Sequence, residues 1–199
     1  LHFSRQSRRT PELAGSLGLG VLAACTVLLP RVLIASAVLT PDVARHLLAV
    51  LAPPFVLGVG LVLVAVLRRQ PAKPAVAGEE PHSPLGLSSA IQMAVAFQVV
   101  LWVVEWAQRA GGQGGVLATA ALLGLTDVDA LTVAMNRLGR APGQAGLAAS
   151  AIGIGIVSNT LLKLALTLVL GTPAFRRVAS IGLLALAAAV AVGVWLAWG

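Results

Sequence analysis

Two carboxylates stand two positions apart in a stretch that is otherwise apolar enough to cross a membrane. Asp127 and Asp129 lie within the segment GLTDVDALTVAMNRLG. An aspartate at the centre of a membrane helix costs roughly 2.5–3.5 kcal/mol on the insertion scale, so each one needs a partner, water or a function. Hard cations such as Mg²⁺ take oxygen ligands, and a proton relay needs only a carboxylate with a water path. The pair therefore indicates cation or proton handling.

Further polar side chains in apolar stretches could complete such a site. The segment SNTLLK places Asn159 and Lys163 four residues apart, hence on one helical face. A lysine opposes cation binding unless its charge is paired or lost. We expect Asp127 and Asp129 to be metal ligands. They belong to a wider set of predicted substrate or ion ligands: Asp127, Asp129, Thr126, Thr132, Asn159, Thr160 and Ser158.

Helix geometry separates the two carboxylates. Each residue turns a helix by about 100°, so residues two apart point about 200° apart. Asp127 then faces away from its neighbour unless the backbone unwinds at Gly124, as broken transporter helices do around ions. The spacing places four side chains in one polar stripe: Thr126, Asp129, Thr132 and Asn136.

A structural interpretation of the same charges stays open. Either aspartate could neutralise Lys163 and so join two spans. Arg31 could likewise reach a carboxylate, and Glu105 lies near a span end among tryptophans, as interfacial residues do. In this view Lys163, Arg31 and Glu105 are structural or coupling charges.

The elements that position these residues are membrane helices. The chain of 199 residues is 58% hydrophobic and only 11% charged, whereas soluble domains carry about 25% charged residues. Because a span needs about 20 apolar residues, the sequence predicts an all-α single transmembrane domain over residues 1–199 with six spans. The prolines at Pro30, Pro53 and Pro54 predict kinks or breaks. The spans cover residues 13–39, 43–67, 85–107, 116–135, 145–170 and 178–198.

The loops predict the orientation. Residues 68–84 are rich in proline and charge and read as a mobile cytoplasmic loop. Counting Lys and Arg around six spans gives eight on the side of that loop and four on the other. The positive-inside rule then places both termini in the cytoplasm, and we expect a multi-pass protein of the bacterial inner membrane.

Other classes of protein are disfavoured. The net charge of +7 is first explained by topology in a membrane protein, so nucleic acid is not an expected partner. Cys25 is the single cysteine, which excludes a disulfide within the chain. The three histidines lack metal-ligand spacing, and no nucleophile elbow or phosphate loop is present, so no enzyme activity is expected.

The chain also carries an internal repeat. A shift of 132 positions lays PRVLIASAVLTP over LKLALTLVLGTP, with Arg31 over Lys163 and Thr-Pro over Thr-Pro. Spans one and two therefore resemble spans five and six. Because four of the predicted spans separate equivalent points, the two copies are expected to have the same orientation, as a parallel repeat.

These motifs resemble the membrane domain of unknown function 4010, often found after an MgtC/SapB domain. GLTDVDALTVAMNRLG is similar to its G-L-x-D-x-D-A-x-T segment, and SNTLLKLALTLVLG to its S/A-N-T-x-x-K segment; PRVLIASAVLTP and the later Pro53-Pro54 also match. The resemblance implies that an earlier span, with Ser or Thr in place of the aspartates, precedes span one and that this chain lacks it. A link to magnesium is implied only by the neighbouring domain.

The sequence thus predicts an integral membrane protein that transports a cation, either a divalent metal such as magnesium or one coupled to protons. The alternative is a non-transporting regulatory or interaction subunit whose buried charges are structural. The incomplete repeat favours a homo-oligomer, such as a dimer, or a partner membrane chain beside the lipid bilayer.

Overall fold

The computed structural model describes residues 14–67 and 87–198, and these form six helices. Within a bilayer every backbone amide must be satisfied inside its own segment, so long apolar runs become helices. Four helices are long and apolar enough to cross a membrane, over Gly18–Leu39, Pro41–Leu67, Ala145–Val169 and Phe175–Ala197. The chain is therefore a multi-pass helical membrane protein. The helices are α2 (Ala14–Leu39), α3 (Pro41–Leu67), α4 (Leu87–Gly124), α5 (Val128–Leu138), α6 (Ala145–Leu170) and α7 (Pro173–Trp198).

The four long helices form two hairpins of the same design. One residue, Thr40, separates α2 from α3, and α3 begins at Pro41. Gly171 and Thr172 separate α6 from α7, which begins at Pro173. Proline suits the first position of a helix because the amide at that position has no partner within the helix. The shift of 132 positions carries the helix bounds of the first hairpin onto the second to within one residue, which confirms the repeat.

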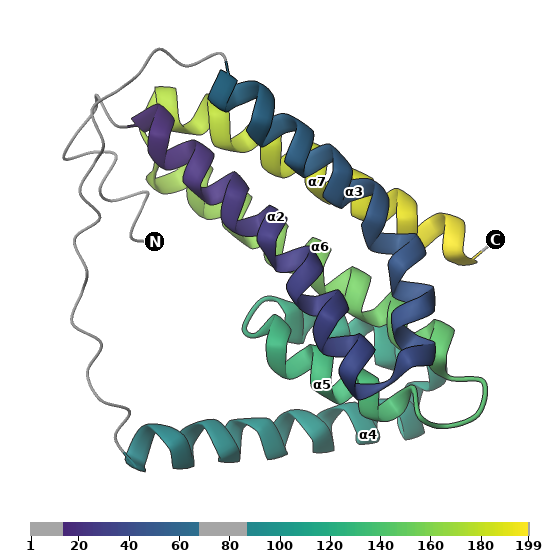
Figure 1. Ribbon diagram of the computed structural model, residues 1–199. Helices are drawn as coiled ribbons and strands as arrows, with labels where there is room; N and C mark the ends of the chain where they lie inside the picture. The colour runs from purple at the N-terminus through teal and green to yellow at the C-terminus, as the bar shows by residue number, and fades with distance from the viewer. Residues whose placement is uncertain (1–13, 68–86, 199) are drawn as a thin grey trace.

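The two copies run in opposite directions, which differs from the parallel orientation expected above. Cys25, in the first half of α2, lies 3.7 Å from Lys163, in the last part of α6. Farther along α2, Ser36 contacts Asn136 on α5, and Gly139, which directly follows α5, packs against Ala148, close to the start of α6. The first hairpin and the second are thus antiparallel in Figure 1. The repeat is inverted.

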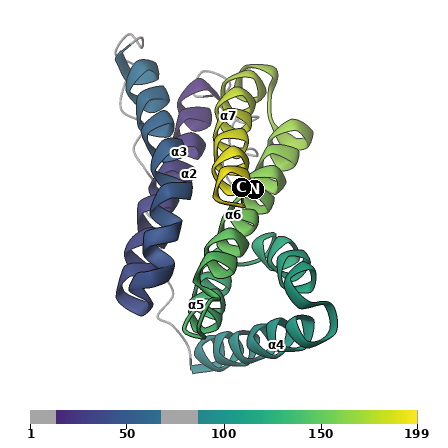
Figure 2. The same cartoon turned by 90° about the vertical axis from the view of Figure 1, so that its right-hand side faces the viewer.

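The predicted fourth span, residues 116–135, is not one helix, because it is divided between the end of α4 and α5. Gly112 bends α4 at φ 55° and ψ −139°, a left-handed conformation that glycine adopts without steric cost. Figure 2 shows the two arms of α4 meeting at this bend. The second arm, residues 113–124, runs along α6 until Gly124 meets Gly155, and α5 then returns to Ala148. The two together form a re-entrant hairpin, defined as residues 113–138.

The contacts of α7 show how it runs relative to α2 and α3. Gly182 of α7 packs against Leu22 of α2, and Gly193 packs against Val50 of α3. Helices α2 and α7 are therefore parallel, so α2 starts at one end of the bundle and α7 finishes at the other. The side of the membrane on which each terminus lies stays a prediction. The predicted loop over residues 68–84 lies outside the described residues.

The prolines inside the spans do not interrupt their helices. Helix α2 continues through Pro30, and α3 continues through Pro53 and Pro54. Each proline frees one carbonyl four residues earlier. Pro54 frees that of Val50, and the backbone of Gly193 lies against this carbonyl. The breaks that the prolines predicted are absent from the described parts of α2 and α3.

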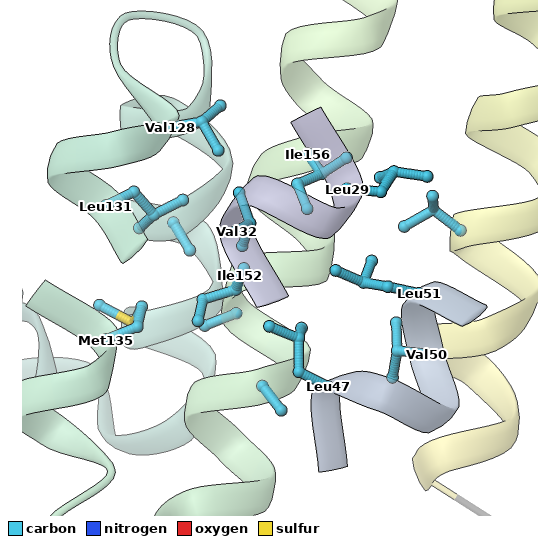
Figure 3. Packing of buried hydrophobic residues seen from close by; sticks show 14 of the residues in the cluster. Leu29, Val32, Leu47, Val50, Leu51, Val128, Leu131, Met135, Ile152 and Ile156 are labelled. Carbon is cyan, nitrogen blue, oxygen red and sulfur yellow. The ribbon is translucent and has the colours of Figure 1, made fainter. Parts of the chain in front are cut away.

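One apolar core joins the two hairpins to the re-entrant hairpin. Figure 3 shows side chains from α2, α3, α5 and α6 converging, among them Leu29, Leu47, Leu131 and Ile152. All four are at most 1% exposed. Because lipid tails are as apolar as leucine, such packing is specified by shape rather than by a hydrophobic force between the helices. The core fixes the re-entrant hairpin against α6.

Candidate ion site at the re-entrant hairpin

The tip of the re-entrant hairpin is a break in the helical backbone. Helix α4 ends at Gly124, and the amides of Leu125 and Thr126 donate to the carbonyls of Leu122 and Leu123 at 3.2 and 3.0 Å. A Cβ at Gly124 would overlap the backbone of Gly155 on α6. This close approach places the break beside the middle of the Ala145–Val169 span. Gly124, where the sequence analysis allowed the backbone to unwind, is the last helical residue before the break.

Asp127 caps the returning helix. Its backbone is extended (φ −149°, ψ 107°), and its Oδ1 accepts hydrogen bonds from the amides of Asp129 at 2.8 Å and Ala130 at 3.1 Å. A carboxylate at a helix N-terminus satisfies orphan amides and opposes the positive end of the helix dipole. Its Oδ2 accepts no hydrogen bond from the residues that the structure describes. The geometry answers why Asp127 departs from the polar stripe: it stands before α5, not on it.

Asn159 of α6 holds the other side of the break. Its Nδ2 donates to the carbonyl of Gly124 at 3.0 Å, so the last carbonyl of α4 does not depend on water. Its Oδ1 is buried and has no hydrogen-bond partner among the described residues. Buried polar atoms of this kind call for a ligand, an ion or an ordered water. The structure thus places Asn159, which the sequence predicts as a ligand, at the break.

Asp129 forms an ion pair with Arg31, not with Lys163. The Arg31 Nη2 lies 2.6 Å from the Asp129 Oδ2, and the pair joins α2 to α5. Both side chains are open in the isolated chain, at 65% and 51% exposure. Arg31 thus reaches a carboxylate, as the structural interpretation of its charge expects. Neither aspartate pairs with Lys163 among the described residues, because the re-entrant hairpin turns Asp129 toward α2.

Lys163 keeps a separate position on α6. Its Nζ lies 3.7 Å from the Sγ of Cys25, and it makes no ion pair within residues 14–67 and 87–198. It shares a helical face with Asn159, one turn away. Lys163 is thus a charge inside a span whose only described polar contact is a thiol.

The rest of the polar stripe docks α5 onto α2. Asn136 is 1% exposed, and its Nδ2 donates to the Oγ of Ser36 at 2.9 Å and to the carbonyl of Thr132 at 2.8 Å. The hydroxyl of Thr40 donates to the Asn136 carbonyl at 3.0 Å. Ser36 and Thr40 were missed by sequence reasoning, although Ser36 stands five positions after Arg31 and Thr40 belongs to the repeated Thr-Pro pair. Thr126 is not on this stripe, since it lies in the break and donates to Leu123.

Three predicted residues lie away from the break or make only local bonds. The hydroxyl of Thr160 is buried and donates to the Ile156 carbonyl at 2.8 Å. Ser158 lines an apolar pocket of about 380 Å³ between the second arm of α4, α6 and α7. Glu105 pairs with Arg109 at 2.7 Å on the first arm of α4. None of the three makes a described side-chain hydrogen bond or ion pair with Asp127 or Asn159.

The chemistry available at the break suits a cation. Three oxygen sources lie there: Asp127 Oδ2, Asn159 Oδ1 and the backbone carbonyls that end the second arm of α4. That arm also directs the negative end of its dipole at the break. The positive end of α5 is already occupied by Asp127, which disfavours an anion. No cluster of three or more His, Cys, Asp or Glu side chains could hold a metal within the described ranges, so carbonyl and amide oxygens would have to supply most ligands.

Comparison with known proteins adds a family but no function. The family model for a domain of unknown function, DUF4010, matches residues 1–171. No curated protein and no solved structure matches the chain.

Proposed function

The chain belongs to the DUF4010 family, and we propose that it transports a small cation across the membrane, with the tip of the re-entrant hairpin as the binding site. The observation that carries the proposal is the backbone break at Leu125–Asp127, beside the middle of the α6 span. Irregular backbone at that depth is tolerated only where protein buries it or where it lines a polar cavity. Transporters place substrate sites at such breaks between inverted repeats.

The arrangement of charges supports a cation rather than an anion. Asp129 is neutralised by Arg31 at 2.6 Å, so the carboxylate with an uncommitted oxygen at the break is Asp127. With the unpartnered Oδ1 of Asn159, it offers ligands that a hard cation or a hydrated proton accepts. Magnesium is one candidate substrate, and a cation whose transport is coupled to protons is the second. Among the described residues, the side chains at the break include no nucleophile beside a base. We therefore propose transport and not catalysis.

The inverted repeat also changes the proposed orientation. Helix α3 ends at Leu67, directly before Arg68 and Arg69 in the sequence, and α7 begins at the same end of the bundle with Arg176 and Arg177. When Arg176 and Arg177 are counted with the basic residues before α2 and after α3, and Arg137 and Arg140 with those of the opposite end, the basic residues again divide eight to four. We place the end of the bundle where α3 finishes in the cytoplasm of a bacterial inner membrane. The opposite end then carries Trp198.

The test is cation flux into proteoliposomes that contain the purified chain. Asp127→Asn is the informative variant, because asparagine caps a helix as well as aspartate does but carries no charge. We expect wild type to take up a divalent cation or exchange protons, and Asp127→Asn and Asn159→Leu to lose most of that flux. Asp42→Asn is the matched control, since Asp42 pairs with Arg45 on the exposed start of α3.

Two results would count against the proposal. Wild-type flux at the level of empty liposomes, for Mg²⁺, Mn²⁺, Na⁺ and protons, would favour the alternative of a regulatory subunit or a homodimer that acts through a partner. Full flux in Asp127→Asn would remove the break from the mechanism.

A further inference from the structure

Two pockets lie one after the other between the second arm of α4, α6 and α7. The outer pocket, of about 200 Å³, lies at the end of the bundle where α7 finishes, and its lining includes Gln113, Ser150 and Ala197. The inner one is the apolar pocket of about 380 Å³, whose lining includes Leu117 and Ile154. Leu117 follows Gln113 by four residues and Ile154 follows Ser150 by four, so the inner pocket begins one helical turn farther along each helix. The two pockets therefore form one groove, with a polar outer end and an apolar inner part.

The outer end of the groove offers hydrogen-bond donors and has no carboxylate in its lining. Helix α6 begins there, and its N-cap, Gln144, makes no side-chain hydrogen bond to the first turn. Gly146 and Leu147, which belong to that turn, line the pocket. Their amides precede the first hydrogen bond of the helix, from the Ala148 amide to the Gln144 carbonyl at 2.9 Å. With the positive end of the helix dipole, these amides favour an anion.

A buried hydroxyl at the same place also indicates a ligand. Ser150 is 3% exposed, and it lines the outer pocket one turn after Gly146. Its hydroxyl makes no hydrogen bond within the described ranges, whereas Thr160 on the same helix donates to the carbonyl four residues earlier. A buried polar group normally has a partner. The Ser150 hydroxyl is therefore available to donate to an oxygen of a bound anion.

The inner part of the groove suits a hydrocarbon chain. Its lining includes Val194 and Trp195 of α7, and it extends along α6 as far as Ser158. From Ser150 to Ser158 the helix rises about 12 Å, at 1.5 Å per residue. One leaflet of the hydrocarbon core is about 15 Å thick, half of the whole core. The groove therefore has nearly the depth of one leaflet, and an anion site above an apolar channel of that depth matches a phospholipid.

We propose that this groove binds one phospholipid, whose phosphate lies at the start of α6 beside Ser150 and whose acyl chain lies against Trp195. The chain also packs against Leu117 on the second arm of α4 and ends beside Ser158, the residue before Asn159. The lipid therefore helps to hold the second arm against α6 close to the break. The proposal does not depend on cation transport.

Native mass spectrometry of the purified wild-type chain in detergent tests the proposal by titration with three probes. Phosphatidylglycerol has both parts of the ligand, diacylglycerol with the same chains lacks the phosphate, and glycerol phosphate lacks the chains. We expect phosphatidylglycerol to bind at least about tenfold more tightly than either of the others, because only it makes both sets of contacts. Equal affinity for diacylglycerol would remove the phosphate site. Equal affinity for glycerol phosphate would assign the pocket to a free phosphate, and either result would overturn the proposal.

Two substitutions of Gln113 test the polar end of the groove. Gln113→Glu keeps the shape of the side chain but places a negative charge beside the phosphate, and we expect it to weaken phosphatidylglycerol binding by about tenfold. Gln113→Lys places a positive charge there and should not weaken binding. Because the two variants change the same residue, each is the control for the other. Equal weakening in both would contradict phosphate binding at this place.

Filling the inner pocket tests the apolar part. Ala191 lines this pocket, so Ala191→Phe places a ring where the acyl chain lies and should weaken phosphatidylglycerol binding by about tenfold. Ala37→Phe is the matched control, since Ala37 is exposed on α2 and lines neither pocket, and it should bind as wild type does. Wild-type affinity in Ala191→Phe would overturn the proposal. The comparison of the three probes uses the wild-type chain alone, so it decides the matter even if a variant does not fold.

Discussion

Helices α2 and α6 are equivalent in the repeat and equal in length, yet they support the re-entrant hairpin in different ways. Helix α2 meets α5 through polar contacts from Arg31, Ser36 and Thr40. Helix α6 lies against α3, α4, α5 and α7. It meets the hairpin through Gly155, where the equivalent residue of α2 is Ala23, and through one hydrogen bond from Asn159 to Gly124. Small residues let membrane helices approach closely, and glycine allows the closest approach. The comparison shows that the same repeated helix holds the hairpin by several polar contacts in one copy, and by close packing with one hydrogen bond in the other.

Enlarging the glycine that supports the hairpin should give the largest effect. Gly155→Leu places a side chain where even a Cβ would overlap Leu131. We expect a loss of about 3 kcal/mol or more in the free energy of unfolding, since the packed core cannot move aside. At the equivalent position of α2, Ala23→Gly should cost only about 1 kcal/mol, the helix propensity of glycine.

The measurement is reversible unfolding in mixed detergent micelles. Gly60→Ala is the control, because no atom lies within 4 Å of the Cβ that it adds. Equal losses for Gly155→Leu and Gly60→Ala would show that α6 does not support the hairpin by close packing.

The ion pair in the first copy should give an intermediate effect. Arg31→Met or Asp129→Asn leaves one charge without its partner, and we expect each to cost about 2–3 kcal/mol, the scale for a charge at a helix centre. The double variant should regain part of that loss, as a double-mutant cycle would show. Lys163→Met should cost less than Arg31→Met, since it breaks no described ion pair. Strict additivity of the Arg31 and Asp129 effects would contradict a direct interaction.

The smallest effect should come from removing the Thr40 hydroxyl, the last of the polar contacts between α2 and α5. Thr40→Val removes the donor to the Asn136 carbonyl and should cost about 1 kcal/mol in the same unfolding measurement, as one buried hydrogen bond does. Thr172→Val sharpens the comparison. A similar loss means that the second copy has a partner for its hydroxyl, and no loss means that it has none.

The sequence was sufficient for the long helices. The predicted spans 13–39, 43–67 and 145–170 match α2, α3 and α6 closely, and span 178–198 falls within α7. Continuous apolar runs leave the backbone no alternative to a helix in lipid. Pro173 was left outside its helix because the span was measured by hydropathy, which ignores the preference of proline for a first turn.

The site was only partly predictable. Asp127 as a helix cap could have been inferred from the sequence, because an aspartate just before a helical pattern is a start signal. The pairing of Asp129 with Arg31 joins residues 98 positions apart and depends on whether the predicted fourth span crosses or returns. Length and hydropathy do not distinguish a crossing from a hairpin of the same length.

The bond between Asn159 and Gly124 has a consequence for synthesis. The amide that satisfies the last carbonyl of α4 is encoded 35 residues later. At about 5–20 residues per second, the ribosome takes on the order of seconds to supply it. A bare carbonyl at membrane depth is costly during that interval. The nascent hairpin is therefore expected to wait in the translocon or at the aqueous surface and to enter the bilayer together with α6.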